Sequence, residues 1–168
     1  MTKVYNRSVA ALSPGSALPA LSLTDALGGA AAPPAGETLY GFFKTTCPTC
    51  ELAWPFFDRI GRAARGGRLS VIAVSQDEPA PTDDFNRRLG VALPTLFDAP
   101  PWRGSAALGL DTVPTFLRVG ADGRVLGTLI GFQKEKMQDL AREAAALAGK
   151  AAPEIFRPGD AVPSIKPG

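Results

Sequence analysis

Residues 41–55 read GFFKTTCPTCELAWP, and this stretch carries most of the information about the fold. Its beginning belongs to a short apolar run, 38–44 (TLYGFFK), whose aromatic and β-branched residues predict a buried strand. Its end opens a segment, 50–64, in which apolar residues recur every four positions, as on one face of a helix. The stretch therefore predicts a strand that leads directly into an amphipathic helix, with two cysteines at the junction.

The two cysteines are separated by Pro48 and Thr49. At the start of a helix, Cys47 lies near unpaired backbone N–H groups and the positive end of the helix dipole, which lowers the pKa of a thiol. Pro48 suits the first helical turn, where its missing N–H costs nothing. Cys50 lies one turn further on the same face, close enough to form a disulfide but more shielded. The spacing predicts an attacking thiol, Cys47, and a resolving thiol, Cys50.

Three other interpretations of the cysteine pair are half of a zinc site between subunits, an inert structural disulfide, and two unrelated core cysteines. Two thiols are too few for a four-thiolate zinc site in one chain. A disulfide across a two-residue loop restrains little of the unfolded chain. A cysteine pair that follows a strand in a strand–helix–strand context favours redox chemistry over all three.

Composition excludes several classes of function. The chain has 168 residues and no histidine, so histidine-based catalytic pairs and histidine-ligated metal sites are excluded. The 18 basic and 16 acidic side chains leave a net charge of +2, which gives no argument for nucleic acid or an anionic membrane as a partner. No phosphate-binding or dinucleotide-binding glycine motif is present.

The rest of the chain alternates between strand and helix patterns. Strands are expected at 69–74, 95–97, 115–119 and 124–130, and helices at 83–89, 103–108 and 133–147. The last two strands flank Gly-Ala-Asp-Gly at 120–123, which predicts a hairpin turn. A strand–helix–strand unit followed by a hairpin and a helix predicts an α/β sheet with helices on both faces.

Proline and glycine mark the expected irregular segments. We expect a surface loop at 28–36 and proline-rich connectors at 78–82 and 99–101. Residues 151–168 contain four prolines and are expected to lack regular structure. The tail's apolar residues suggest that it lies on the globule; they are Ile155, Phe156, Val162 and Ile165. The domain organisation expected is an N-terminal segment 1–14, one domain 15–150 and the tail 151–168.

The sequence also bears on location. Residues 1–13 contain no apolar stretch of signal-peptide length, so we expect a cytoplasmic protein. A chain whose leader had been removed would look the same, and would be periplasmic or extracytoplasmic. No window approaches the roughly 20 apolar residues that a spanning helix needs, so no membrane span is expected.

Three segments together resemble the thioredoxin-like superfamily over residues 15–148. Residues 41–55 resemble its active-site segment, including Pro55 five residues after the second cysteine. Residues 112–116 (TVPTF) resemble the segment that bears the superfamily's cis-proline, and Asp122-Gly123-Arg124-Val125, followed by Gly131, resembles the hairpin after it. An insert at 76–110 and an extension at 17–25 make the chain similar to the redoxin or TlpA-like branch of thiol–disulfide oxidoreductases.

The resemblance implies a thioredoxin fold, with a central mixed sheet flanked by helices on both faces, an N-terminal extension and an insert before the cis-proline strand. It implies catalysis by Cys47 and Cys50 with no bound cofactor and no metal. It also implies that Pro114 packs in the cis form against the cysteines, and that the backbone of Val113 pairs with an extended substrate segment. Pro48 and Thr49 complete the expected substrate-binding residues. The expected partners are a protein or small-molecule disulfide and an external thiol electron donor.

The sequence departs from the superfamily where a proton acceptor for the resolving cysteine is common. The two usual carboxylate positions hold Gly41 and Ala53. Water, or a distant carboxylate such as Asp77 or Asp98, is left for this role, whereas Glu51 is expected on a solvated face. Thr46 replaces the tryptophan that commonly precedes the first cysteine, so the recognition surface is expected to differ.

Two other functions are open. One is a peroxiredoxin-like thiol peroxidase, although Lys44 stands where that family carries a threonine three residues before its reactive cysteine. The other is a redox-inert binding module that uses the groove beside Pro114. Trp54 and Trp102 are both expected to be packing residues, although Trp102, in a proline-rich loop, could line a groove. Arg59, Arg62, Arg65 and Arg68 recur every three residues, a spacing typical of a solvated helix face and loop.

Overall fold

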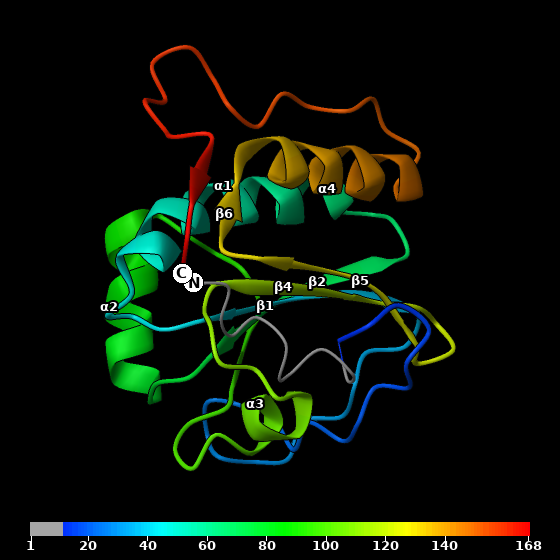
Figure 1. Ribbon diagram of the computed structural model, residues 1–168, viewed down its shortest axis with the longest axis vertical. Helices are drawn as coiled ribbons and strands as arrows, with labels where there is room; N and C mark the ends of the chain where they lie inside the picture. The colour runs from blue at the N-terminus through cyan, green and yellow to red at the C-terminus, as the bar shows by residue number, and fades with distance from the viewer. Residues whose placement is uncertain (1–11) are drawn as a thin grey trace, which may run out of the picture.

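The computed structural model describes residues 12–168 and centres on a five-stranded sheet (Figure 1). The strand order is β3-β2-β1-β4-β5. β1, β2 and β3 pair in parallel, whereas β4 pairs antiparallel with both β1 and β5. The bounds are β1 Glu37–Phe43, β2 Leu69–Ser75, β3 Thr95–Phe97, β4 Thr115–Val119 and β5 Val125–Ile130. The sheet is therefore mixed, as the sequence predicts.

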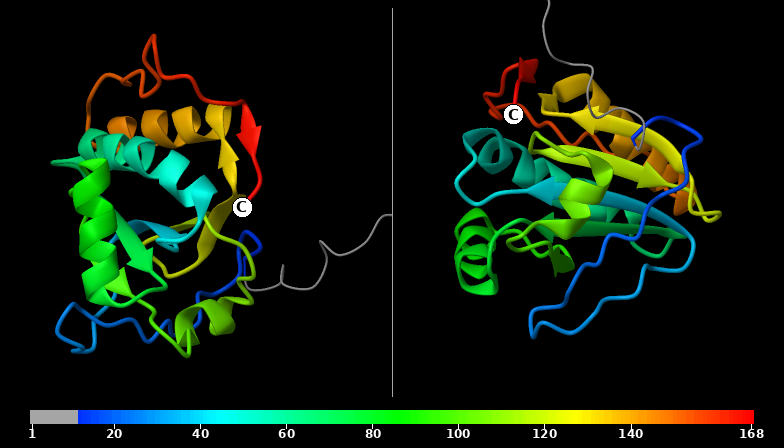
Figure 2. Two further views of the ribbon diagram at one scale, coloured as in Figure 1. Left: turned by 90° about the vertical axis from the view of Figure 1, so that its left-hand side faces the viewer. Right: turned by 60° about the horizontal axis from the view of Figure 1, so that its bottom comes forward.

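Helices cover both faces of this sheet. On one face α1 (Pro48–Ala64) and α4 (Lys134–Leu147) lie side by side (Figures 1 and 2). The short helix α3 (Arg103–Leu108) and the segment before β1 lie on the other face (Figure 1). Helix α2 (Pro79–Leu89) contributes Phe85 to the same core cluster as α1 and α4. The predicted α/β architecture with helices on both faces is confirmed.

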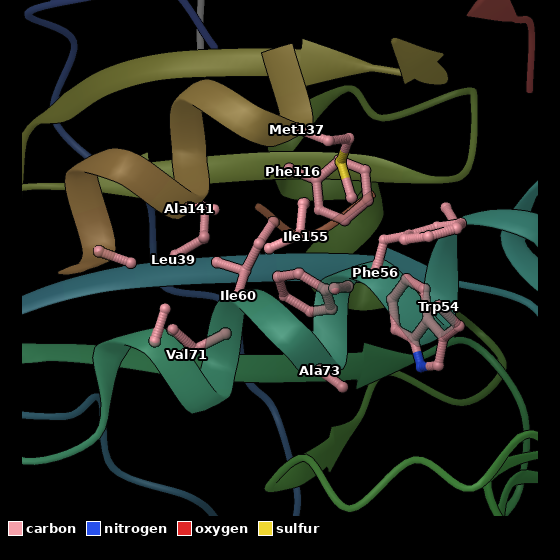
Figure 3. Close-up of a cluster of buried hydrophobic side chains, with 14 of the residues drawn as sticks. Leu39, Trp54, Phe56, Ile60, Val71, Ala73, Phe116, Met137, Ala141 and Ile155 are labelled. Atoms are coloured by element: carbon pink, nitrogen blue, oxygen red, sulfur yellow. The ribbon is translucent and has the colours of Figure 1, made fainter. Parts of the chain in front are cut away.

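The central strand β1 supplies both halves of the core. Leu39 and Phe43 point into the cluster under α1 and α4, whereas Tyr40 and Phe42 belong to the cluster on the opposite face. Figure 3 shows part of the first cluster, in which side chains of the sheet, α1 and α4 interlock. A strand buried on both faces reads as a continuous apolar run because alternate side chains face opposite layers. This burial makes β1 a rigid base for the residues that follow it.

Several predicted elements have the observed bounds, and one connector prediction is wrong. The strands at 95–97 and 115–119 and the helix at 103–108 match, and Gly123 N–H donates to Gly120 O at 2.9 Å in the expected hairpin turn. Residues 79–82, expected in a connector, form the first turn of α2. Proline is compatible with this place because the first N–H groups of a helix have no intrahelical partner.

The tail is more ordered than the sequence predicts. Residues Ile165–Lys166 form β7, which pairs antiparallel with β6 (Phe132–Gln133) in a second, two-stranded sheet. The expectation that the whole tail lacks regular structure is therefore wrong. Ile155 is buried, and Phe156 and Val162 pack against the main core, but Ile165 is 66% exposed, contrary to prediction. The division of the chain at 14 and 150 stays a prediction.

No helix within residues 12–168 combines the length and the apolar character needed to cross a bilayer.

Candidate active site

The first cysteine lies at the junction between β1 and α1. Cys47 is the residue that caps the N-terminus of α1, with extended backbone angles (φ −93°, ψ 115°). Its N–H donates to the carbonyl of Lys44 at 3.2 Å. The carboxylate of Asp77, which follows β2, accepts the N–H of Thr45 at 2.7 Å. The loop before Cys47 is thus fixed to the ends of two buried parallel strands.

Cys47 is held in an environment that favours its thiolate. The N–H of Cys50 donates to the Cys47 sulfur at 3.1 Å. A hydrogen bond from the Cys50 side chain is the largest cause that lowers the pKa of Cys47, from 9.0 to about 6, and partial burial opposes it. Backbone N–H groups of Cys50 and Thr49 and the positive charge of Lys166 lower this pKa further. At neutral pH about nine-tenths of Cys47 is then thiolate.

Cys50 has the opposite environment. Its side chain is fully buried in the core cluster that also contains Ala53 and Trp54. Burial raises the pKa of Cys50 above its ordinary range, and the hydrogen bond and negative charge of Cys47 raise it further. No disulfide joins the two cysteines in this structure, which therefore describes the dithiol form. The pair consists of one thiol that ionises readily and one that keeps its proton.

The segment before β4 meets the cysteine pair. The Val113–Pro114 peptide bond is cis, as the sequence predicts, and Pro114 is buried. The Cys47 sulfur donates to the carbonyl oxygen of Val113 at 3.4 Å. Only the protonated thiol can donate, so this contact favours the neutral form and opposes the effect of the helix terminus. The structure thus brings into contact two predicted site residues, Cys47 and Val113, that are 66 residues apart in the sequence.

The two residues between the cysteines differ in exposure. Pro48 is exposed, but Thr49 is only 4% exposed, and its hydroxyl donates to the carbonyl of Pro167 at 2.6 Å. The tail therefore reaches the candidate active site, which sequence reasoning missed. The tail's four apolar residues, Ile155, Phe156, Val162 and Ile165, are the signal that the tail lies on the globule, and they do not indicate where it ends.

Packing explains why the two usual carboxylate positions hold Gly41 and Ala53 instead. A Cβ placed on Gly41 would lie 2.4 Å from Cε1 of Phe57, so the aromatic ring fills the space of any side chain there. Ala53 is fully buried in the same cluster. Side chains of the hydrophobic core thus occupy the region behind Cys50 where a carboxylate would otherwise lie.

The other carboxylates considered from the sequence are bound elsewhere. Asp98 is buried and accepts hydrogen bonds from the N–H groups of Gly104 and Ser105 at the start of α3. Glu51 forms an ion pair with Arg88 on the surface. Within residues 12–168, no carboxylate is hydrogen-bonded to the sulfur of either cysteine.

A groove of about 400 Å³ lies beside Val113, on the side of the insert. Trp102, which is 39% exposed, lines it, and the Lys44 ammonium lies 4.8 Å from the centre of the Trp102 ring. Trp54 is fully buried, as expected. The groove lies next to Val113, whose carbonyl oxygen accepts the hydrogen bond from Cys47.

The part of the chain that the structure describes contains no group of three or more side chains suited to hold a metal ion.

In comparisons with known proteins, no family model and no curated sequence matches this chain, whereas many solved structures do. The thioredoxin domain of a thiol-disulfide oxidoreductase from Bacteroides vulgatus aligns with a TM-score of 0.67 at 14% identity, over 79% of this chain and 97% of that one. A secreted disulfide oxidoreductase from Mycobacterium tuberculosis, homologous to E. coli DsbE, aligns with a TM-score of 0.59 at 17% identity, over 76% and 97%. StoA from Bacillus subtilis aligns with a TM-score of 0.57 at 18% identity, over 80% and 98%.

Proposed function

Because this chain has the fold of the thioredoxin-like superfamily, we propose that it is a thiol–disulfide oxidoreductase that uses the Cys47–Cys50 pair. One observation carries the proposal. A thiol at a helix N-terminus, with a pKa lowered to about 6, lies beside a fully buried thiol whose pKa is raised. This pairing is suited to two consecutive exchange steps in a fixed order.

In the first step, the Cys47 thiolate attacks one sulfur of a substrate disulfide. A bond forms between Cys47 and that sulfur, the substrate S–S bond breaks, and the other substrate sulfur leaves as a thiolate. Since Cys47 is half-buried and Cys50 is fully buried, Cys47 is the thiol that an incoming substrate meets. The backbone of Val113, beside the Cys47 sulfur, would pair with the extended substrate segment.

In the second step, Cys50 loses its proton and attacks the sulfur of Cys47. The Cys47–Cys50 disulfide forms, the mixed disulfide breaks, and the second substrate sulfur leaves as a thiolate. The substrate is reduced by two electrons and the protein is oxidised by two. Mixed-disulfide formation removes the negative charge of Cys47, which is one cause of the raised pKa of Cys50. Since core side chains fill the usual carboxylate positions, water or the leaving thiolate takes the proton.

The proposed partners follow from these steps. The substrate is a protein disulfide or a small-molecule disulfide, and an external thiol donor restores the dithiol. The chemistry is completed by the two sulfurs, so we propose that the protein works without a bound cofactor or metal.

The compartment sets the direction of exchange. In a reducing cytosol, the location expected from the sequence, the pair would reduce substrate disulfides. In an oxidising compartment, the same pair would pass its disulfide to substrate thiols. One of the similar solved structures is of a secreted protein. Cell fractionation with an antibody against this chain tests the cytoplasmic location.

The mechanism is tested by trapping. Replacing Cys50→Ser removes the resolving thiol, so a mixed disulfide with a substrate should accumulate through Cys47. The matched variant, Cys47→Ser, should accumulate none under the same conditions. Non-reducing electrophoresis and peptide mass mapping identify the linked cysteine. Equal trapping through Cys50 in the Cys47→Ser variant would refute the assigned order.

Turnover assays and the reduction potential distinguish the proposed function from the two alternative functions. We expect reduction of insulin disulfides to be much faster than reduction of hydrogen peroxide, whereas a peroxiredoxin-like peroxidase would show the reverse preference. We also expect the reduction potential to lie between about −270 and −120 mV, the range of known exchange catalysts. A potential far outside this range would favour a redox-inert binding module.

A further inference from the structure

The tail is attached to the helices of one face along most of its length. The side-chain amide of Gln138, on α4, donates to Pro153 O at 2.7 Å and accepts the N–H of Ile155 at 3.0 Å. The guanidinium of Arg59, on α1, donates to Ile155 O and pairs with Asp160 at 2.8 Å. Arg59 is therefore not part of a merely solvated face, contrary to the sequence prediction. These bonds carry the tail across α4 and α1.

The last five residues return to the cysteine pair. We call residues 164–168 the strap. The strap begins where the carbonyl of Ser164 accepts the N–H of Lys134 at 2.9 Å, and it continues as β7 beside β6. In Figures 1 and 2 it ends beside the start of α1. There the carbonyl of Pro167 accepts the Thr49 hydroxyl.

The end of the strap lies directly against Val113. A Cβ placed on Gly168 would lie 2.2 Å from the carbonyl oxygen of Val113 and 2.7 Å from Cγ2 of Thr112. The same carbonyl oxygen accepts the Cys47 thiol. Only a glycine fits at this position, so the backbone of the strap contacts the backbone to which an extended substrate segment is expected to pair.

From these contacts we propose that the strap is an autoinhibitory segment, which occupies the peptide-binding surface formed by Thr49 and Val113 and must move before a protein disulfide can reach Cys47. This inference rests on the proposed function for the identity of the substrate, but the contacts themselves do not depend on it. With the strap in place, Cys47 is still partly exposed. A small disulfide can reach the exposed part of Cys47 while the strap is in place, whereas a folded or extended polypeptide cannot. The strap therefore selects by size.

The strap is tested by comparing small and bulky thiol reagents. In the Cys50→Ser background only Cys47 can react, and the rates are measured well above the pKa of Cys47 so that changes in ionisation do not contribute. The reagents are N-ethylmaleimide and a maleimide attached to a polyethylene glycol chain. The variants are Gly168→Val, whose side chain cannot fit against Val113 O, and a deletion of residues 164–168. The control is Gly127→Ala, because a Cβ there meets nothing within 4 Å.

We expect the rate of the bulky reagent, divided by that of the small reagent, to rise about fivefold or more in both strap variants. Loss of one neutral hydrogen bond, such as that from Thr49 to Pro167, changes the ratio of displaced to bound strap by a factor of about five. The control should keep the original ratio. An unchanged ratio, an equal rise for both reagents, or a slower bulky reagent would each overturn the proposal. The equal rise would indicate altered thiol reactivity, and the slower rate would make the strap part of the docking surface.

Disulfide turnover distinguishes this proposal from the proposed function. With both cysteines present, the strap variants should reduce insulin faster than the unaltered chain, at similar rates toward a small aromatic disulfide. If the alkylation ratio rises but no variant reduces insulin, the strap is supported and the proposed function is refuted. If insulin is reduced but the alkylation ratio does not change, the proposed function stands and the strap is refuted.

Discussion

The hydrogen bond from the Cys50 side chain is the largest cause of the low pKa of Cys47, so its removal makes a quantitative prediction. The variant Cys50→Ala keeps the backbone donors of the helix terminus but loses this bond. A hydrogen bond to a charged group is worth about 1.5–3 kcal/mol, and one pKa unit is about 1.4 kcal/mol. The pKa of Cys47 should therefore rise from about 6 by about one to two units.

This rise changes the thiolate fraction at pH 7 from about nine-tenths to between about one-half and one-tenth. Since the thiolate is the nucleophile, alkylation of Cys47 by iodoacetamide at pH 7 should slow by about twofold to tenfold. The assay is the alkylation rate as a function of pH, followed by mass spectrometry. In the reference chain the rate should rise with pH and reach half its maximum near pH 6.

The matched control is Cys50→Ser, which keeps a side-chain donor. Its hydroxyl can still bond to the Cys47 thiolate, so its midpoint should stay closer to 6 than that of Cys50→Ala. If the alanine and serine variants both keep the reference midpoint, the side-chain bond does not stabilise the thiolate and the backbone donors alone are responsible. That outcome would refute the reasoning.

Three further predictions concern stability and are measured by urea unfolding of the reduced protein. Gly41→Ala should destabilise the fold by about 1–3 kcal/mol, because the new methyl group overlaps the ring of Phe57; an unchanged midpoint would contradict this packing. The folded pKa of Cys47 lies below its unfolded value, so its contribution is complete above the unfolded pKa of 9.0 and is lost as pH falls through about 6. A Cys47→Ala variant should lack this pH dependence, and a parallel dependence in both chains would argue against it. In the tail, Ile155→Ala should cost about 2–5 kcal/mol because the side chain is buried, and Ile165→Ala should stay within about 0.5 kcal/mol; similar losses at both would contradict the observed burial.

The sequence predicted the cysteine setting well because the relevant signals are local. An apolar run before Cys47 and a four-residue apolar period after Cys50 define a strand, a helix and the junction between them. The cis bond before Pro114 was predicted from a resemblance that spans three separate segments. Signals of this kind depend on residues near each other in the chain, or on a motif order shared by a fold.

The strap and the start of α2 were missed for physical reasons. β7 is two residues long and flanked by Pro163 and Pro167, so its local sequence favours irregular structure. Its pairing with β6 and the bond from Thr49 to Pro167 are tertiary contacts with no local signal. The prolines in 78–82 favour a connector, although the first turn of a helix tolerates proline. In both segments, the effect of proline on secondary structure depends on its position in the element, which the local sequence does not reveal.

The contact between Gly168 and Val113 has a practical consequence for handling this protein. A purification tag or fluorescent label joined after residue 168 would emerge beside Cys47 and compete with whatever approaches it. Measurements of reactivity on such a fusion would describe the added peptide as much as the protein itself. Leu27, which is 97% exposed in the loop held by Asp25, offers an exposed attachment point in another part of the sequence.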